Sequence, residues 1–203
     1  CAIPMSQTPD VSTLDLTGVD LVMECTGKAD GRDVAERPLK AGARRVLISG
    51  PSSAADATIV IGANGSDLAD QQIISNASCT TNALAPLVRV LDDTWGVRTG
   101  WMTTIHCYTG SQPTIDAPRG DMMRSRAAAL SMVPTTTSAM RLLDHVLPDI
   151  AGRIEGAAVR VPVASVSAVD LTVTLQEDVS RDQVIEVLSK PTSIIGCTDK
   201  PLV

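Results

Sequence analysis

A cysteine and a histidine are the residues of this 203-residue sequence best suited to chemistry. Cys79 lies within Ser75–Asn82, between an apolar run typical of a strand and a segment with helical spacing. At the start of a helix, unpaired backbone N–H groups and the positive end of the helix dipole stabilise a thiolate. His106 follows the strand-like run Trp101–Ile105, where an imidazole can face a cleft and move protons for a thiol. The two residues therefore predict nucleophilic catalysis by a thiol that is assisted by a base.

Both residues also have a structural interpretation. Cys79 could be a small buried residue at a strand–helix junction, and a lone histidine such as His106 often has a structural role at a strand end. The other histidine, His145, lies next to an aspartate in a helical pattern, and we expect it on the surface. Cys107 would point to the opposite face of its strand from His106, and Cys25 lies in an apolar run. We expect both of these cysteines to pack in the core.

The composition is typical of a globular protein and argues against several other classes. Hydrophobic residues make up 44% and charged residues 20% of the chain, and the net charge of −6 argues against nucleic acid as the main partner. No apolar run approaches the length of about 18 residues that spans a membrane, and no secretory signal is visible. The five cysteines are irregularly spaced and form no CxxC pair, which argues against a disulfide framework or a structural zinc site. We therefore expect reduced thiols, no metal and a cytoplasmic protein.

Strand and helix patterns alternate through residues 10–78. This alternation predicts a parallel, doubly wound α/β sheet. The expected strands are Val19–Glu24, which we expect to be buried, Arg45–Ser49, Thr58–Ile61 and Ile73–Asn76, and the expected helix is Asp30–Ala43, disrupted near Pro38.

Beyond residue 80 the pattern changes to long strands and longer helices, which predicts an α+β arrangement. A large ordered loop is expected over Tyr108–Arg126, where no period is visible. A helix is expected over Thr80–Trp95, which Pro86 must kink or start. The other expected elements are a strand over Gly100–His106, a helix over Thr135–Ile150 capped by its first threonines, a β segment over Gly156–Glu177, and a helix over Ser180–Ser189 with a capping box of Ser180 and Gln183.

The segment Ala77–Asn82 resembles the active-site signature of the phosphorylating glyceraldehyde-3-phosphate dehydrogenase family. The similarity extends from about Val19 through Val203 with compatible spacing. Further matching stretches are Glu24–Gly27, Met102–His106, Val133–Thr137, Arg160–Pro162 and Val169–Thr172. Because many short stretches match in register, the resemblance does not depend on the thiol segment alone.

The resemblance implies the domain organisation and the cofactor. Residues 1–78 would be the C-terminal part of an NAD(P)-binding Rossmann domain, and residues 79–203 a catalytic domain with a mixed, largely antiparallel sheet. The sequence contains no G-x-G-x-x-G motif, begins at Cys1 and ends at Val203, so we expect a segment of a longer protein that binds NAD or NADP poorly by itself. The implied remainder of the cofactor site is Thr26, Gly27 and Ser49.

The resemblance also implies a reaction. Cys79 attacks the aldehyde of glyceraldehyde 3-phosphate, and His106 takes the proton as hydride leaves for the nicotinamide. The resulting thioacyl enzyme is attacked by inorganic phosphate, which releases 1,3-bisphosphoglycerate.

Two anion sites are implied for this reaction. Arginine forks and hydroxyl or N–H donors suit phosphate groups in a protein whose net charge repels anions. The implied residues are Thr109 and Arg160 for the substrate phosphate, and Ser78, Thr80, Arg124, Thr137 and the backbone of Ser138 for the attacking phosphate. Ser138 stands where the family usually has glycine, which is a strain only if the backbone needs an unusual φ. The structural alternatives are a solvated loop residue for Arg124 and a strand-edge charge for Arg160.

Three other functions remain open from the sequence. An erythrose-4-phosphate dehydrogenase shares these residues, although Thr109 favours the glyceraldehyde enzyme. A cysteine hydrolase could use Cys79 and His106, but no protease signature accompanies them. A non-catalytic role would be indicated by an unreactive Cys79. Members of the family are tetramers, and Tyr108–Arg126 resembles the loop that reaches the cofactor of a neighbouring subunit, so the expected partners are a triose phosphate, inorganic phosphate and further copies of the chain.

Overall fold

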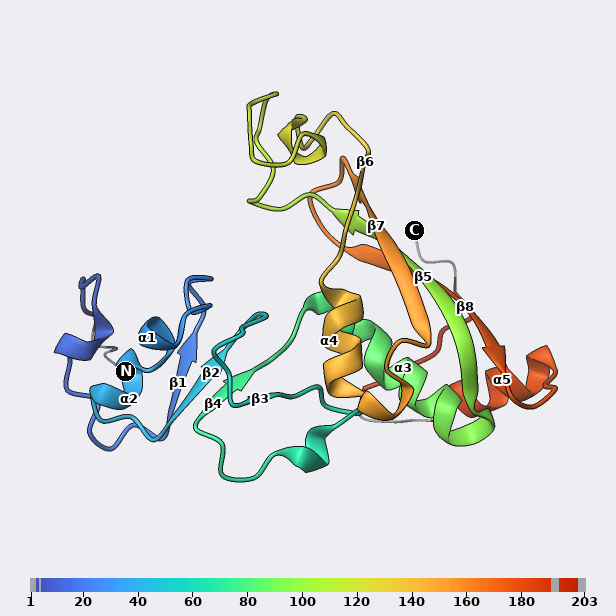
Figure 1. Ribbon diagram of the computed structural model, residues 1–203, viewed down its shortest axis with the longest axis horizontal. Helices are drawn as coiled ribbons and strands as arrows, with labels where there is room; N and C mark the ends of the chain where they lie inside the picture. Colours follow the sequence, from blue (N-terminus) through green and yellow to red (C-terminus); the bar gives the residue numbers. More distant parts are fainter. Residues whose placement is uncertain (1–2, 4, 191–193, 201–203) are drawn as a thin grey trace. The chain divides into compact units, whose positions relative to one another are not determined.

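A computed structural model describes residues 3, 5–190 and 194–200 of the chain. It divides into two compact units (Figure 1). The first consists of Cys1–Val60 with Asn64–Cys79, and the second of Ile61–Ala63 with Thr80–Val203. Among the described residues, no helix is long and apolar enough to cross a membrane.

The first unit contains a four-stranded, all-parallel sheet in the order β1-β2-β4-β3, which confirms the parallel sheet expected for this part of the chain. Val46 and Ile48 of β2 and Ile73 of β4 form its core together with small residues such as Ala35. The strands are β1 (Leu21–Glu24), β2 (Arg45–Ile48), β3 (Ala57–Thr58) and β4 (Ile73–Ser75), and the short 3-10 helices are η1 (Val11–Thr13) and η2 (Gly65–Asp67).

Strand β1 is less buried than its apolar sequence predicts. Leu21 is 45% exposed and Met23 is 69% exposed, and Cys25 just beyond them is exposed as well. The reason is that β1 lies at the edge of the sheet order, next to β2. The expectations of a buried strand here and of a core position for Cys25 are therefore wrong.

The helix expected over Asp30–Ala43 is present as two short helices. They are α1 (Arg32–Ala35) and α2 (Arg37–Lys40), separated at Glu36. Pro38 lies in the first turn of α2, where its missing N–H leaves no helical hydrogen bond unmade. Proline thus breaks the helix as the sequence predicts, by starting a new one.

The second unit contains a mixed four-stranded sheet in the order β6-β7-β5-β8. The central strand β5 is parallel to β7 and antiparallel to β8, and β6 is antiparallel to β7. The mixed, largely antiparallel sheet is therefore confirmed. The strands are β5 (Val97–Cys107), β6 (Val133–Thr135), β7 (Ile154–Val161) and β8 (Ser167–Leu175).

Three helices accompany this sheet. Helix α3 (Cys79–Trp95) continues through Pro86, and α5 (Arg181–Leu188) begins with the expected capping box of Ser180 and Gln183. Helix α4 (Ala139–Val146) contacts β7 and is followed by the 3-10 helix η4 (Pro148–Ile150). The expected helix start at Thr135 is wrong, because Thr135 pairs with Ala158 as the last residue of β6. Short strands of three residues leave too little periodicity to be predicted from sequence.

Side chains of β5 alternate between a covered and a more exposed face. Met102, Thr104 and His106 are buried, whereas Trp101 and Ile105 are about half exposed. Cys107 is only partly buried, so the expected core position is wrong for this residue too. His145 is exposed, as its sequence context predicts.

A long ordered loop joins β5 to β6 and extends beyond the end of the sheet in Figure 1. The loop contains the short 3-10 helix η3 (Met123–Ser125). Polar contacts hold the loop: the Asp116 carboxylate accepts from the Ala127 N–H at 2.8 Å, and the Ser125 hydroxyl donates to the Asp121 carbonyl at 2.8 Å. This confirms the large loop expected over Tyr108–Arg126.

Gly156 fixes how closely β7 approaches β5, and its replacement tests that packing. A Cβ at this position would lie 2.5 Å from the carbonyl oxygen of Met102. We expect Gly156→Ala to lower the free energy of unfolding by about 1–3 kcal/mol, because the backbone of β5 has to move. Denaturation followed by fluorescence reports on this unit, since Trp95 and Trp101 both belong to it. Gly120→Ala is the matched control, because nothing lies within 4 Å of its Cβ. Equal unfolding midpoints for the two variants would contradict the close approach.

Candidate active site

The Cys79 thiol is placed by a tight turn between β4 and α3. The turn contains Ala77, which is buried and adopts a left-handed φ of 56° that non-glycine residues rarely adopt. The Ser75 hydroxyl stabilises this turn: it accepts from the Ala77 N–H at 3.1 Å and donates to the Gly50 carbonyl at 2.8 Å. As a result Cys79 is the first residue of α3 and is exposed. Sequence reasoning missed the left-handed alanine, because nothing in its side chain favours that conformation.

Hydroxyl groups flank the thiol in sequence. Ser78 is partly buried just before the helix, and Thr80 is buried in its first turn. Helix α3 has 17 residues, long enough for its first-turn N–H groups and dipole to favour a negative charge at its start. The start of α3 is therefore the kind of position at which a negative charge is favoured, and the roles of Ser78 and Thr80 stay predictions.

His106 lies at the end of β5, directly opposite Arg160 of β7. The imidazole is 8% exposed, and its Nδ1 is 2.9 Å from Nη1 of Arg160. Nδ1 is also 2.7 Å from the carbonyl oxygen of Cys107, to which the same Nη1 donates at 3.0 Å. The sequence suggested both residues separately, but it could not show that two residues 54 positions apart would touch.

The end of β5 is anchored by the turn between β7 and β8. The Cys107 N–H donates to the carbonyl of Val166 and to the hydroxyl of Ser167, each at 3.3 Å. Val166 has a φ of 65°, an unusual conformation for a β-branched residue. Ser167 and Val166 were not identified from the sequence as site residues, and they hold the backbone next to His106 in place.

A second cationic position forms around Arg124 at the end of the long loop. Its Nε donates to the Thr135 hydroxyl at 3.0 Å and its Nη2 to the Thr136 carbonyl at 3.3 Å. Thr137 follows directly, and its hydroxyl accepts from the N–H of Ala139 at the start of α4. The structure thus brings Arg124 close to the segment that carries Thr137 and Ser138.

Ser138 occupies its position without backbone strain. It precedes α4 with φ −75° and ψ −7°, which is ordinary right-handed geometry. The possible cost of serine in place of glycine therefore does not arise here.

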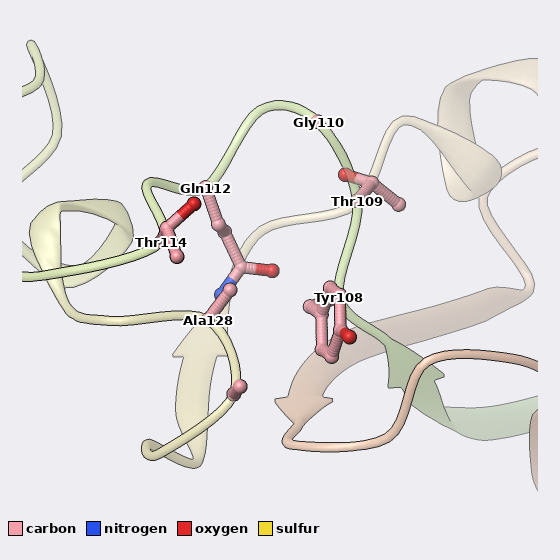
Figure 2. A pocket seen from close by; sticks show the side chains of 7 residues that line it. Tyr108, Thr109, Gly110, Gln112, Thr114 and Ala128 are labelled. Carbon is pink, nitrogen blue, oxygen red and sulfur yellow. The ribbon is translucent and has the colours of Figure 1, made fainter.

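Thr109 lines a pocket of about 350 Å³ in the loop that follows β5 (Figure 2). Its hydroxyl lies 3.0 Å from that of Ser111. Gln112 extends into the wall of this pocket between Tyr108 and Ala128, and it is 6% exposed. Neither polar atom of its amide has a hydrogen-bond partner among the described residues. The buried amide was not noticed in the sequence, because burial within a loop leaves no periodic signal.

The residues expected at the cofactor site lie at the carboxyl ends of neighbouring parallel strands. Thr26 and Gly27 follow β1, and Ser49 follows β2. The Ser49 N–H donates to the Glu24 carbonyl at 3.0 Å, and the Glu24 carboxylate accepts from the N–H and the hydroxyl of Thr26. This edge of a parallel sheet is where nucleotide cofactors bind, so the residues present fit such a ligand. No group of acidic, histidine and cysteine side chains suited to a metal ion occurs within residues 3, 5–190 and 194–200.

The expected site residues fall into two groups. The first unit holds Thr26, Gly27, Ser49, Ser78 and Cys79, and the second unit holds the remainder. Within the second unit, His106 and Arg160 are in contact, and Arg124 lies beside the segment of Thr137.

Comparisons with known proteins assign the chain to a family. The family model described as the C-terminal domain of glyceraldehyde 3-phosphate dehydrogenase matches residues 78–203. Glyceraldehyde-3-phosphate dehydrogenase of Xanthobacter flavus is 46% identical over 190 residues, which cover 91% of this chain and 57% of that protein. The enzyme of Pseudomonas aeruginosa is 48% identical, covering 92% of this chain and 57% of that protein, and glyceraldehyde-3-phosphate dehydrogenase 2 of Bacillus subtilis is 46% identical over 91% and 56%. The chain thus spans little more than half the length of these relatives. It belongs to the glyceraldehyde-3-phosphate dehydrogenase family.

Proposed function

We propose that this chain forms part of a phosphorylating glyceraldehyde-3-phosphate dehydrogenase that uses NAD or NADP. Residues 1–78 would complete a cofactor-binding domain, and residues 79–203 would form most of a catalytic domain. The observation that carries the proposal is the exposed Cys79 at the first position of α3, set there by a left-handed alanine. Backbone conformations of this kind cost roughly 1–3 kcal/mol and are concentrated at functional sites. Free cysteines at positions 25, 79, 107 and 197 support a reducing compartment such as the cytoplasm.

The proposed chemistry assigns a separate task to each side chain. Cys79 adds to the aldehyde carbon, and His106 accepts the hydroxyl proton of the resulting hemithioacetal as hydride departs. A nicotinamide cofactor supplies the hydride acceptor when bound. The thioester on Cys79 is then cleaved by inorganic phosphate, which releases an acyl phosphate and restores the thiol. Keeping the acyl group on sulfur conserves the energy of the oxidation until phosphate arrives.

Two arginines support the proposed anion sites. Arg160 and Thr109 would hold the substrate phosphate at the end of β5, near His106. Arg124, Thr137 and the backbone of Ser138 would hold the attacking phosphate, with Ser78 and Thr80 contributing hydroxyl groups. The Arg124 side chain is 34% exposed, and its Nε also forms an ion pair with the Asp121 carboxylate at 3.5 Å. A planar fork of N–H donors is well suited to phosphate oxygens.

We further infer that copies of the chain associate, in the complete protein as a homotetramer, through the loop between β5 and β6. Large apolar side chains are exposed along this loop instead of being buried: Ile115 is 73%, Met122 88%, Met123 55%, Leu130 83% and Met132 72% exposed. Clusters of exposed apolar residues on one segment are typical of protein–protein interfaces.

Association through this loop predicts that a charge there separates the subunits. We expect Leu130→Asp to give smaller species than the wild type in sedimentation at micromolar concentration, because a carboxylate would be buried in the interface. Leu68→Asp, at an exposed apolar position of the other unit, should leave the mass unchanged. A wild-type protein that sediments as a monomer, or equal masses for all three proteins, would contradict the inference.

An activated thiol predicts selective alkylation of Cys79. With a limiting amount of iodoacetamide, we expect Cys79 to react at least about tenfold faster than the exposed Cys25 and Cys197. Peptide mass spectrometry of the chain gives the three rates in one sample, and Cys79→Ala should remove the fast phase alone. Reaction of Cys79 at the same rate as the other two cysteines would favour a non-catalytic role.

The reaction itself is tested on the chain extended with the segments that its relatives carry. Cofactor reduction is followed with glyceraldehyde 3-phosphate and with erythrose 4-phosphate, each with and without inorganic phosphate. We expect faster, phosphate-dependent turnover of the triose, a loss of at least about a thousandfold in Cys79→Ala, and no turnover by the 203-residue chain alone. Tight cofactor binding to that chain in calorimetry would contradict the last expectation. A preference for the tetrose without a phosphate requirement would assign the chain to erythrose-4-phosphate dehydrogenase instead.

A further inference from the structure

The dipeptide Asn64–Gly65 has the residue types that allow an asparagine side chain to react with the backbone. The chain has three asparagines, and Asn64 is the one followed by glycine, whereas Asn76 and Asn82 precede alanine. Because glycine has no Cβ, the peptide nitrogen after Asn64 is open to close approach by a side chain. Attack of that nitrogen on the side-chain amide forms a five-membered ring, which is the general route by which asparagine loses ammonia. The sequence therefore places a labile amide at this position.

The structure holds this amide away from the reaction. Asn64 is 9% exposed, its Oδ1 accepts from the Val60 N–H at 2.8 Å, and its Nδ2 donates to the Thr58 carbonyl at 3.0 Å. The Asn64 N–H also donates to the Val60 carbonyl at 3.1 Å, and the 3-10 helix η2 begins at the next residue. The side-chain amide and the backbone on both sides of it are thus fixed. Cγ of Asn64 cannot turn onto the Gly65 nitrogen until these bonds open.

The turn that these bonds close contacts helix α3. Ile61–Ala63 belongs to the second unit, whereas Val60 and Asn64 on either side belong to the first. Within this turn, Gly62 has a φ of 86° and packs closely on α3, since a Cβ there would lie 3.3 Å from the Cβ of Pro86. Asn64 therefore closes the base of a segment that packs on the helix of the proposed thiol.

We propose that Asn64 is a site of deamidation that is gated by opening of this turn. When the turn opens, the Gly65 nitrogen attacks Cγ of Asn64, the Cγ–Nδ2 bond breaks, and ammonia leaves with the proton of the attacking nitrogen. Water then cleaves the cyclic imide at one of its two carbonyl carbons, which gives aspartate or isoaspartate. Water is the one co-reactant, and no group is oxidised or reduced.

The modified turn cannot close as before. A carboxylate at position 64 can still accept from the Val60 N–H, but it has no donor and would set an oxygen against the Thr58 carbonyl, where Nδ2 now donates. Burial of that charge without a donor is unfavourable. Isoaspartate also adds an atom to the backbone and so displaces the N–H that donates to the Val60 carbonyl. An opening that ends in reaction is therefore permanent. The proposal does not rest on the proposed catalytic function.

Peptide mass spectrometry of the 203-residue chain, aged in mildly alkaline buffer, measures the reaction at each asparagine. We expect Asn64 in the folded chain to react at least about tenfold more slowly than in the chain unfolded by urea, because only the open fraction reacts. Gly65→Ala is the matched variant, since nothing lies within 4 Å of its Cβ. In urea its Asn64 should react at least about tenfold more slowly than in the wild type, because the Cβ obstructs the approach. Asn76 and Asn82 are the internal references in urea.

Hydrogen exchange tests the consequence for the turn. In folded Asn64→Asp we expect the peptide that contains Val60 to exchange at least about tenfold faster than in folded Gly65→Ala, because the Val60 N–H loses its protection. If Asn64→Asp does not fold, the same exchange is measured on aged wild-type chain, whose modified peptides separate by chromatography.

Three results would overturn the proposal: equal rates of ammonia loss from folded and unfolded chains, no loss from Asn64 in urea, or unchanged exchange at Val60 after modification. None of these measurements depends on turnover. Failure of the gated deamidation and failure of the proposed reaction can therefore be told apart.

Discussion

The parallel register between β5 and β7 is the constraint on which the second unit depends. It runs from Gly100 opposite Ile154 to Cys107 opposite Val161, and it places His106 opposite Arg160. A slip of one residue would turn every side chain of β7 to the other face and set valine beside the imidazole. Gly156 supports this register, because its missing side chain lets the two strands approach each other at Met102, four residues before His106. A packing requirement in the middle of the sheet thus determines the geometry of polar groups at its end.

Strain and hydrogen bonding are combined at the ends of the strands that carry site residues. Ala77 and Val166 are the two non-glycine residues with positive φ among the residues the structure describes. Ala77 lies two positions before Cys79, and the carbonyl of Val166 is hydrogen-bonded to the N–H of Cys107. Each is compensated by specific bonds: the Ser75 hydroxyl supports the turn of Ala77, and the Val166 carbonyl accepts from Cys107. Unfavourable backbone conformations persist where surrounding bonds determine them. These hydrogen bonds stabilise the two strained turns and so fix the backbone at Cys79 and at the end of β5, which carries His106.

Local patterns allowed most elements to be predicted from the sequence, while their pairing could not be. Three features depend on only a few adjacent residues, and the structure contains all of them: the capping box at Ser180, the helix break at Pro38 and the start of α3 near Cys79. β6 was missed because its three residues become a strand only through pairing with β7. The exposure of Cys25 was not predicted, because the apolar run before it is what a buried strand of a parallel sheet would show. The contact between Arg160 and His106 could not be predicted either. Both residues were candidates from the sequence, but they lie 54 positions apart and meet only through the pairing of β5 with β7.

The loop between β5 and β6 buries a polar side chain and exposes several apolar ones, which is the reverse of the usual distribution. The hydrogen bonds that hold the loop explain how this arrangement is stable. The amide of Gln112 is buried without a described partner, which costs roughly 1–3 kcal/mol, while apolar residues such as Leu130 are exposed. A loop that depended on burial of its own apolar residues would not keep this conformation. Instead it is tied by polar bonds, from Asp116 to the Ala127 N–H and from Arg124 to the Thr135 hydroxyl. Because Arg124 anchors the loop to β6 and its guanidinium also lies beside the Thr136 carbonyl, the order of the loop and the anion site that we propose depend on the same side chain.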